Sequence, residues 1–297
     1  MSEVRRSVCH MKFGFIGSYG SPAQQVRLAR ECEANGWDGF FTWDGVSLDA
    51  GEFDAGATWD PFALLGAAAA VTERITLGAM VFAVPRRRPW ELAQQALTID
   101  HLSGGRFVLP VGVGVPIDRA FTSVAGQPTA LRDRAETLDD TLGWLERSWS
   151  TDVFDFEGQH VTTGDFQFPL APVGGRIPVW PVAVWDAQRP PRRSLDRALR
   201  WEGIVPQVRG DSPEDAEASP DDIAALAAWV AEHRAETDEP FDIIFQGRLD
   251  ADPAIAAEQA RAAADAGATW WIDSWWDPGT VTPEWLLERA RQGPPAL

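Results

Sequence analysis

Long apolar runs alternate with amphipathic stretches along this chain, and one segment shows the pattern most clearly. The run 75–84 is almost continuously apolar, which is typical of a strand buried on both faces of a parallel sheet. Pro89 can begin a helix because its missing N–H is not needed in the first turn. Apolar residues then recur at helical spacing, at Leu92, Ala96, Ile99 and Leu102. Glycines at 104–105 end that helix, and a second apolar run, 107–113, follows. Residues 75–113 therefore predict a βαβ unit with the helix as crossover.

The same alternation extends over the rest of the chain. Apolar runs predict strands at 12–17, 39–43, 75–84, 107–113, 177–182, 203–208, 241–245 and 269–273. Helical spacing predicts helices at 22–35, 61–71, 89–103, 130–149, 192–201, 223–233, 253–266 and 283–291. Eight strand–helix pairs in a chain of 297 residues favour a single (β/α)8 TIM barrel, an α/β fold. A doubly wound parallel sheet is the alternative.

Three segments depart from the alternation. Residues 150–176 have period-2 character with glycine turns, so they predict a small hairpin inserted between the fourth and fifth barrel strands. Residues 1–10 predict a flexible N-terminal tail, which leaves 11–297 as the barrel domain. Residues 44–58, rich in glycine and aspartate, predict a long loop after the second strand.

Charge and composition narrow the possible partners. The net charge is 26 − 44 = −18, which argues against nucleic acid or an anionic membrane as a partner. No run of 18 apolar residues predicts a membrane span, and the N-terminus lacks the apolar core of a signal peptide. Cys9 and Cys32 form neither a disulfide framework nor a metal-ligand spacing. We therefore expect a cytoplasmic protein.

In a barrel of this kind the functional site lies at the C-terminal ends of the strands. None of the four histidines follows a predicted strand, and His160 lies in the inserted hairpin. No G-x-S-x-G or H-E-x-x-H motif is present, so no metal site and no Ser/His catalysis are predicted. Of the arginines 86–88, we expect at least two to be solvated and one to be available for a phosphate or acidic group. The strand ends otherwise supply aromatic residues and scattered aspartates, which suits a large planar cofactor with its own reactivity.

The block 74–114, RITLGAMVFAVPRRRPWELAQQALTIDHLSGGRFVLPVGVG, resembles the central block of the bacterial luciferase-like flavin-dependent oxidoreductases. In that family the block reads approximately R-I-x-L-G, P-x-R-x-P, L-A, T-x-D-x-L-S-G-G-R and G-x-G. The similarity extends to ANGWDGFFTWD at 34–44, to IPVWPV at 177–182 and to DAGATWWI at 265–272.

The resemblance implies a TIM barrel that holds FMN, or the deazaflavin coenzyme F420, at its C-terminal mouth. Family members often carry a non-prolyl cis peptide behind the flavin ring, and the matching bond is Met80–Val81 or its neighbour. The family's phosphate-binding backbone maps to 183–185, although the glycine pair common there is missing. The cofactor contacts so implied are Ala79, Met80, Val81, Val113, Ala183, Val184 and Trp185.

The deazaflavin branch includes sugar-phosphate dehydrogenases that read D-H after the second strand and T-G-E after the fourth. Here those places read Asp44-Gly45 and Val115-Pro116-Ile117, so that activity is not expected, and FMN is favoured as the cofactor.

We therefore expect a monooxygenase that uses reduced FMN and molecular oxygen on an apolar or aromatic small molecule. Asp44 and Trp43 are the expected catalytic residues, with Asp44 positioning or polarising the substrate. The substrate pocket is expected to include Tyr19, Trp275, Trp276 and Gln246. The resemblance also implies a homodimer and a separate flavin reductase as partner. Two alternatives are a coenzyme F420-dependent hydride-transfer oxidoreductase and a non-catalytic flavin-binding barrel.

Overall fold

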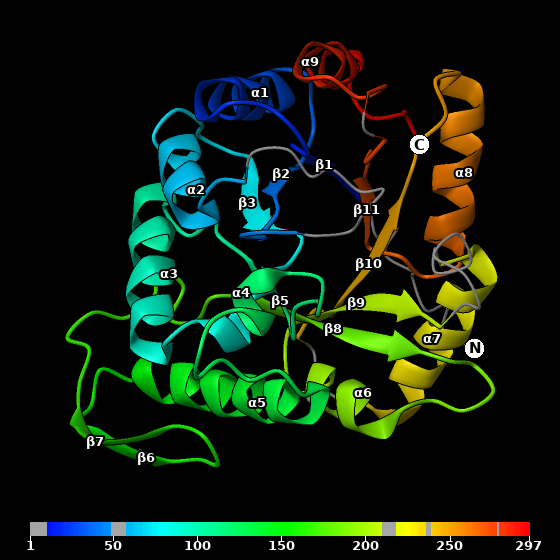
Figure 1. The fold of residues 1–297 in the computed structure, drawn as a ribbon. Coiled ribbons are helices and arrows are strands. Elements are labelled where there is room, and N and C mark those ends of the chain that lie inside the picture. Colours follow the sequence, from blue (N-terminus) through cyan, green and yellow to red (C-terminus); the bar gives the residue numbers. More distant parts are fainter. Residues whose placement is uncertain (1–10, 49–57, 210–217, 236–238, 278) are drawn as a thin grey trace.

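The computed structural model describes residues 11–48, 58–209, 218–235, 239–277 and 279–297. The predicted tail 1–10, most of the predicted loop 44–58, and Cys9 lie outside the described residues. Parallel strands form a barrel in the described part, with helices around it (Figure 1). The barrel strands are β1 (Lys12–Ile16), β2 (Gly39–Thr42), β3 (Thr76–Ala79), β4 (Phe82–Ala83), β5 (Leu109–Gly112), β8 (Val179–Trp185), β9 (Gly203–Val208), β10 (Asp242–Gly247) and β11 (Trp270–Asp273).

The hydrogen-bonded order of the strands is β3-β2-β1-β11-β10-β9-β8-β5-β4. The two end strands, β3 and β4, are successive segments of the third barrel strand. An isolated parallel bridge between Leu77 and Phe107 joins β3 to the chain just before β5 and so connects the two ends. Its backbone bonds are Leu77 N to Arg106 O, 3.0 Å, and Val108 N to Leu77 O, 2.9 Å. Within the described residues, eight strand positions therefore surround one axis, which confirms the predicted (β/α)8 barrel.

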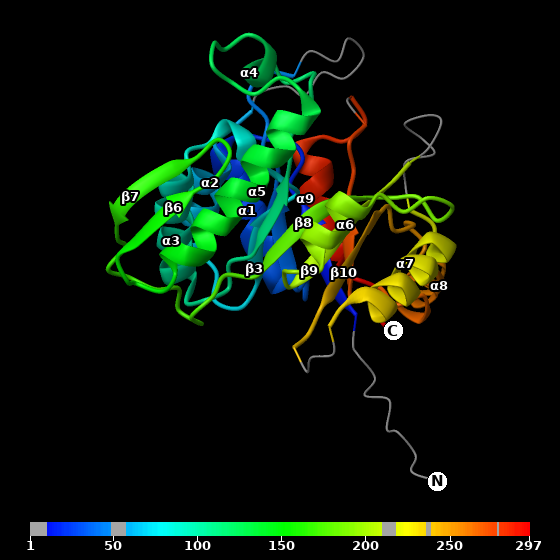
Figure 2. The same ribbon diagram turned by 90° about the horizontal axis from the view of Figure 1, so that it is seen from below.

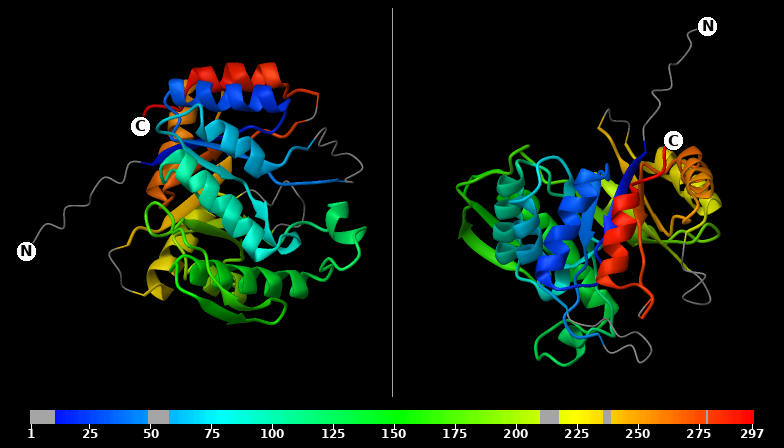
Figure 3. Two further views of the ribbon diagram at one scale, coloured as in Figure 1. Left: turned by 90° about the vertical axis from the view of Figure 1, so that its left-hand side faces the viewer. Right: turned by 90° about the horizontal axis from the view of Figure 1, so that it is seen from above.

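Helices form the outer layer, and several of them have a capping side chain at their N-terminus. They are α1 (Pro22–Ala34), α2 (Pro61–Ala69), α3 (Pro89–Ser103), α4 (Arg119–Thr122), α5 (Leu131–Ser148), α6 (Arg192–Ala198), α7 (Pro220–His233), α8 (Pro253–Asp265) and α9 (Pro283–Gln292). Side chains at the N-cap accept backbone N–H groups in α1, α2, α7, α8 and α9, each of which has proline in its first turn. The first and last helices, α1 and α9, lie side by side (Figure 3). None of the described helices is long and apolar enough to cross a bilayer.

The inserted segment forms the predicted hairpin. Strands β6 (Phe154–Glu157) and β7 (Thr162–Phe166) are antiparallel and lie outside the barrel, next to α5 (Figure 2). Trp144 of α5 is fully buried beneath the hairpin, with its ring centroid 5.3 Å from that of Phe154 and 4.9 Å from that of Phe166. The Trp144 indole N–H also donates to Thr163 Oγ1 at 2.9 Å. One aromatic side chain thus anchors the insertion to the barrel.

Large aromatic side chains fill the interior of the barrel. The ring centroid of Trp270 lies 5.4 Å from that of Trp180 and 6.0 Å from that of Phe41. Glycine at position 14 makes room for them, since a Cβ atom there would lie 2.7 Å from Phe41 Cε2. The interior is therefore packed, as is usual in such barrels, and open space is left at the mouth.

Three local predictions need correction. The third strand is not continuous over 75–84, because it is interrupted at residues 80–81 and passes into a short 3-10 helix, η1 (Val84–Arg86). The fifth strand runs to Trp185 rather than ending at 182. In the helix after the third strand, the apolar spacing of Leu92, Ala96, Ile99 and Leu102 predicts one buried face, but the side chain of Leu102 is 54% exposed.

Candidate cofactor site at the barrel mouth

A cavity of about 390 Å³ opens at the C-terminal ends of the strands. Its wall on the side of the third strand is formed by Met80 and Val81, and the peptide bond between them is cis. This confirms the position predicted for a non-prolyl cis bond. Val182 of β8 and Val205 of β9 add further apolar surface.

A glycine in β5 allows this wall to approach its neighbours closely. A Cβ atom at Gly112 would lie 3.0 Å from Val81 Cγ2 and 3.4 Å from Val182 Cγ2. The segment around the cis bond Met80–Val81 is called the cis bulge below. Any side chain at position 112 would have to enter the space between this bulge and β8. The G-x-G of the central block therefore serves close packing here.

The polar groups of the cavity come from the later strands. Gln207, Gln246, Arg248 and Ser274 line it. Arg248 is the one ionisable side chain among the described lining residues, and it is half-exposed. Its guanidinium lies 2.9 Å from Asp277 Oδ2, which offsets its charge. The cavity therefore presents amide and hydroxyl groups but no carboxylate or histidine from the described lining.

Aromatic residues from three strand ends pack together beside the cavity. The rings of Trp43 and Trp276 meet at 81° with centroids 5.7 Å apart. The hydroxyl of Tyr19 donates to the Trp276 carbonyl oxygen at 2.9 Å, and the Trp43 indole N–H donates to the Ser18 carbonyl oxygen at 2.8 Å. Of the three aromatic residues, Trp276 lines the cavity. The structure thus brings these predicted site residues together, with Trp43 and Tyr19 behind Trp276.

Asp44 lies in a buried network of charges rather than in the cavity lining. It is ion-paired with Arg86, and its Oδ1 lies 2.8 Å from Arg87 Nη2. Its Oδ2 accepts the backbone N–H of Ala83, in β4, at 2.9 Å. Arg86 also contacts Asp118 Oδ2 at 2.8 Å. The side-chain exposures of Asp44 and Asp118 are only 1% and 2%.

The prediction that at least two arginines of 86–88 are solvated is wrong. The side chains of Arg86 and Arg87 are 7% and 14% exposed, whereas that of Arg88 is 69% exposed. Their partners follow other strands, so no local pattern could show the pairing. A catalytic role for Asp44 stays a prediction, and its oxygens are engaged by two arginines and a backbone N–H.

The remaining predicted cofactor contacts are spread over two environments. Val113 lines the cavity, whereas Ala79, Ala183 and Trp185 are buried in the core between barrel and helices. Val184 is partly buried and is not part of the lining. Their assignment as cofactor contacts stays a prediction. For residues 183–185 the predicted contact is made by the backbone, so the direction of their side chains does not decide it.

Asp273 and Trp275, at the end of β11, are occupied in packing. Asp273 Oδ1 accepts the Trp275 indole N–H at 2.9 Å, and its Oδ2 lies 3.0 Å from Arg289 Nε. Burial raises the pKa of the Asp273 carboxyl above its ordinary value, and the charge of Arg289 opposes that shift. Trp275 in turn lies beneath the guanidinium of Arg248, 5.5 Å from its ring centroid.

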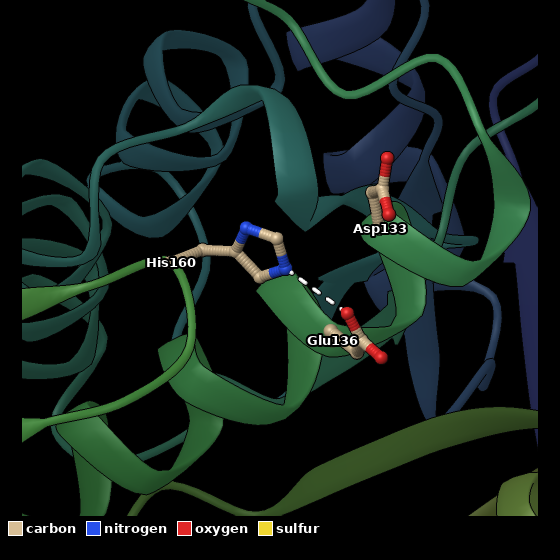
Figure 4. A group of neighbouring side chains, drawn as sticks. All are labelled: Asp133, Glu136 and His160. Atoms are coloured by element: carbon tan, nitrogen blue, oxygen red, sulfur yellow. Dashed lines mark hydrogen bonds and ion pairs between the residues drawn. The ribbon is translucent and has the colours of Figure 1, made fainter.

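A cluster that sequence spacing did not reveal lies on the insertion side. Asp133 and Glu136 of α5 and His160 of the β6–β7 turn have ligand atoms within 4.8 Å of one another (Figure 4). Glu136 is already bonded to Arg132 Nε at 2.7 Å and lies 3.2 Å from His160 Nε2. Arg132 and then His160 hold the pKa of Glu136 below its ordinary value. The three residues come from α5 and the hairpin, not from the strand ends that form the mouth.

Comparison with known proteins identifies the family. The family model for luciferase-like monooxygenases matches residues 8–276, and the chain belongs to this family. The F420-dependent glucose-6-phosphate dehydrogenase 1 of Rhodococcus jostii (strain RHA1) is 27% identical over 279 residues, covering 92% of this chain and 76% of that protein. The 4-hydroxyprotoasukamycin monooxygenase of Streptomyces nodosus subsp. asukaensis is 39% identical over 98 residues, covering 33% of this chain and only 25% of that protein.

Solved structures show the same fold. The coenzyme F420 dependent tetrahydromethanopterin reductase from Methanopyrus kandleri superposes with a TM-score of 0.73 at 14% identity, covering 96% of this chain and 98% of that chain. The oxygenating constituent of 3,6-diketocamphane monooxygenase from Pseudomonas putida, in complex with FMN, gives 0.69 at 16% identity, covering 94% and 96%. At these identities the likeness establishes the fold alone.

Proposed function

We propose that this chain is a flavin-dependent oxidoreductase that uses reduced FMN and molecular oxygen to oxygenate an apolar or aromatic small molecule. The observation that carries the proposal is the mouth cavity itself. Its wall is the cis bulge at Met80–Val81, and Arg248 is the one ionisable group among its described lining residues. A site with so few acid/base groups suits a reaction whose reactivity comes with the cofactor.

The residues of the cavity fit a flavin. Met80, Val81 and Val182 offer an apolar surface for one face of a planar ring system. The amides of Gln207 and Gln246 can donate and accept hydrogen bonds, as the polar edge of such a ring requires. When bound there, FMN would supply the redox chemistry.

The chain's own contribution is binding and the exclusion of water. Trp276, backed by Trp43 and Tyr19, forms an aromatic wall beside the cavity. A dry site limits side reactions of a reactive bound cofactor. Reduced FMN would come from a separate reductase. The homodimer and the cytoplasmic location stay predictions.

A second candidate is hydride transfer with coenzyme F420. It is favoured by the relative from Rhodococcus jostii, whose alignment covers 92% of this chain. Oxidation of an alcohol by hydride transfer needs a group that accepts the hydroxyl proton. The described lining of the cavity offers no carboxylate or histidine for this, which supports the monooxygenase over a dehydrogenase of that kind.

The test is a paired anaerobic titration of the purified apo protein with reduced FMN and with reduced coenzyme F420. We expect tighter binding of FMN and, once air is admitted, slower return of oxidised-flavin absorbance than in buffer. Preference for coenzyme F420 would favour the second candidate. Binding of neither would contradict both.

A further inference from the structure

A second cavity lies directly behind the mouth. It has a volume of about 400 Å³ and is lined by Phe245 of β10, Trp271 of β11, and residues of α7 and α8. Ala218, Gln246, Gly247 and Arg248 line both this outer cavity and the mouth cavity. The two spaces therefore meet at the C-terminal end of β10.

The alternation of side chains along β10 separates the two spaces. Ile244 belongs to the packed barrel interior and Phe245 to the core outside it. Gly247 stands at the end of the strand, where a Cβ atom would lie 3.0 Å from Phe245 Cε1 and 3.3 Å from Trp271 Cζ2. A larger residue there would extend into the outer cavity. Glycine at position 247 therefore leaves room at the place where the two cavities meet.

The outer cavity is apolar, with a negative edge. Its floor is the pair Phe245 and Trp271, whose ring centroids lie 4.4 Å apart at 41°. Ile255 and Ala262 of α8 add aliphatic surface, and Glu258 is the acidic residue of the lining. Glu258 makes no ion pair with any residue that the structure describes, whereas Arg248, the lining residue of opposite charge, is paired with Asp277, which offsets its charge. An aromatic or aliphatic group that is neutral or positively charged fits this environment, and an anion does not.

We propose that the outer cavity binds the distal apolar part of an elongated substrate, whose reacting end lies in the mouth cavity. The assignment of this ligand as a substrate rests on the proposed flavin-dependent function. The outer site itself is defined by its own walls, so the substrate class is an extended aromatic or aliphatic molecule without an anionic group at its distal end.

Two fluorescent probes test the site on the full chain. N-Phenyl-1-naphthylamine is neutral, and 1-anilinonaphthalene-8-sulfonate is the same aromatic framework with a sulfonate. We expect the neutral probe to bind at one site per chain and more tightly than the sulfonate. The substitution Glu258→Gln should reduce this difference in affinity between the two probes. Equal affinity for both probes would overturn the charge argument.

A cavity-filling variant locates the probe. Ala262 is exposed on α8 and lines the outer cavity, so Ala262→Trp fills the space from the solvent side without entering the core. We expect it to weaken binding of the neutral probe at least about tenfold, as loss of roughly 55 Å² of apolar contact would. Ala254→Trp is the matched control, since Ala254 is exposed on the same helix and is not in the lining. Equal binding by the two variants would overturn the proposal.

A third measurement links the outer cavity to the mouth. The emission of the neutral probe overlaps the absorption of oxidised FMN, so bound FMN should quench it in the wild-type chain. Probe binding without quenching, in a chain shown to bind FMN, would refute an occupant shared by the two cavities. If FMN does not bind at all but the probe still distinguishes Ala262→Trp from Ala254→Trp, the proposed function fails and the outer ligand site stands.

Discussion

The buried charge network behind the mouth gives the sharpest test of how this site is held together. Arg86 of η1 contacts two carboxylates that follow other strands, Asp44 after β2 and Asp118 after β5. Asp44 also accepts the N–H of Ala83 beside the cis bulge. Arg86→Met removes the charge and keeps much of the apolar stem, so it isolates the ionic contribution.

The structure sets the size of the expected effect. After the substitution Asp44 keeps Arg87, 2.8 Å away, but Asp118 loses its arginine while only 2% exposed. Asp118 still accepts backbone N–H groups, among them that of Ser47 at 3.1 Å. Removing one partner of a buried ion pair costs about 3–5 kcal/mol. Because these N–H groups continue to stabilise the carboxylate, we expect the lower end, about 3 kcal/mol.

The assay is equilibrium urea unfolding followed by tryptophan fluorescence, with refolding from urea to establish reversibility. Arg88→Met is the control, because Arg88 is 69% exposed and its pair with Glu91 is 3.6 Å long. We expect its cost to be within about 0.5 kcal/mol. Adding Asp118→Asn to Arg86→Met should recover about 1 kcal/mol, since the uncompensated charge is removed. A cost for Arg86→Met no larger than that of Arg88→Met would refute the reasoning.

Three further substitutions test the cavity and the fold. Gly112→Val forces a side chain towards Val81, so FMN affinity should fall at least about tenfold in the titration; unchanged affinity would place the flavin elsewhere. Arg289→Met leaves Asp273 buried and unpaired, and should cost about 3–5 kcal/mol at pH 7 in urea unfolding. Because burial already raises the pKa of Asp273, the cost should be smallest at acidic pH, where the carboxyl is protonated, and grow as pH rises through the folded-state pKa; a pH-independent cost would contradict this. Although burial opposes it, backbone N–H groups of residues 73–75 hold the pKa of Glu33 below its ordinary value. Its contribution to stability is therefore present above the unfolded pKa, about 4.3, and is lost as pH falls through the folded value, so urea midpoints of wild type and Glu33→Gln should converge in acid.

The barrel could be predicted from sequence because its signals are local. Each strand is a short apolar run, and helix starts such as Ser21-Pro22 and Asp252-Pro253 carry their own caps. The cis bond at 80–81 was found through the family resemblance, not through propensity, and it explains why a continuous apolar run contains two strand segments.

The site was harder to predict because it depends on register and on distant pairs. A shift of one residue along a strand exchanges its inner and outer faces. Ala183 and Trp185 thus lie in the outer core, while Val182 lines the cavity. Of the polar lining residues, Gln246 was predicted but Gln207 and Ser274 were not, since a single glutamine or serine near a strand end carries no motif.

The chemistry open to this mouth follows from where its carboxylates point. Asp44 and Asp118 follow barrel strands and Asp273 is the last residue of β11, which are positions where an acid/base group would be expected. Each is buried and paired with an arginine, the first two with Arg86 and the third with Arg289. A carboxylate held in this way stabilises the charged form of its partner and is poorly placed to exchange protons with a substrate. The arginines therefore fix the loops around the mouth and leave the cavity with amides, a hydroxyl and aromatic surface. Such a cavity can bind and shield, and the reaction itself must then depend on what the cofactor brings.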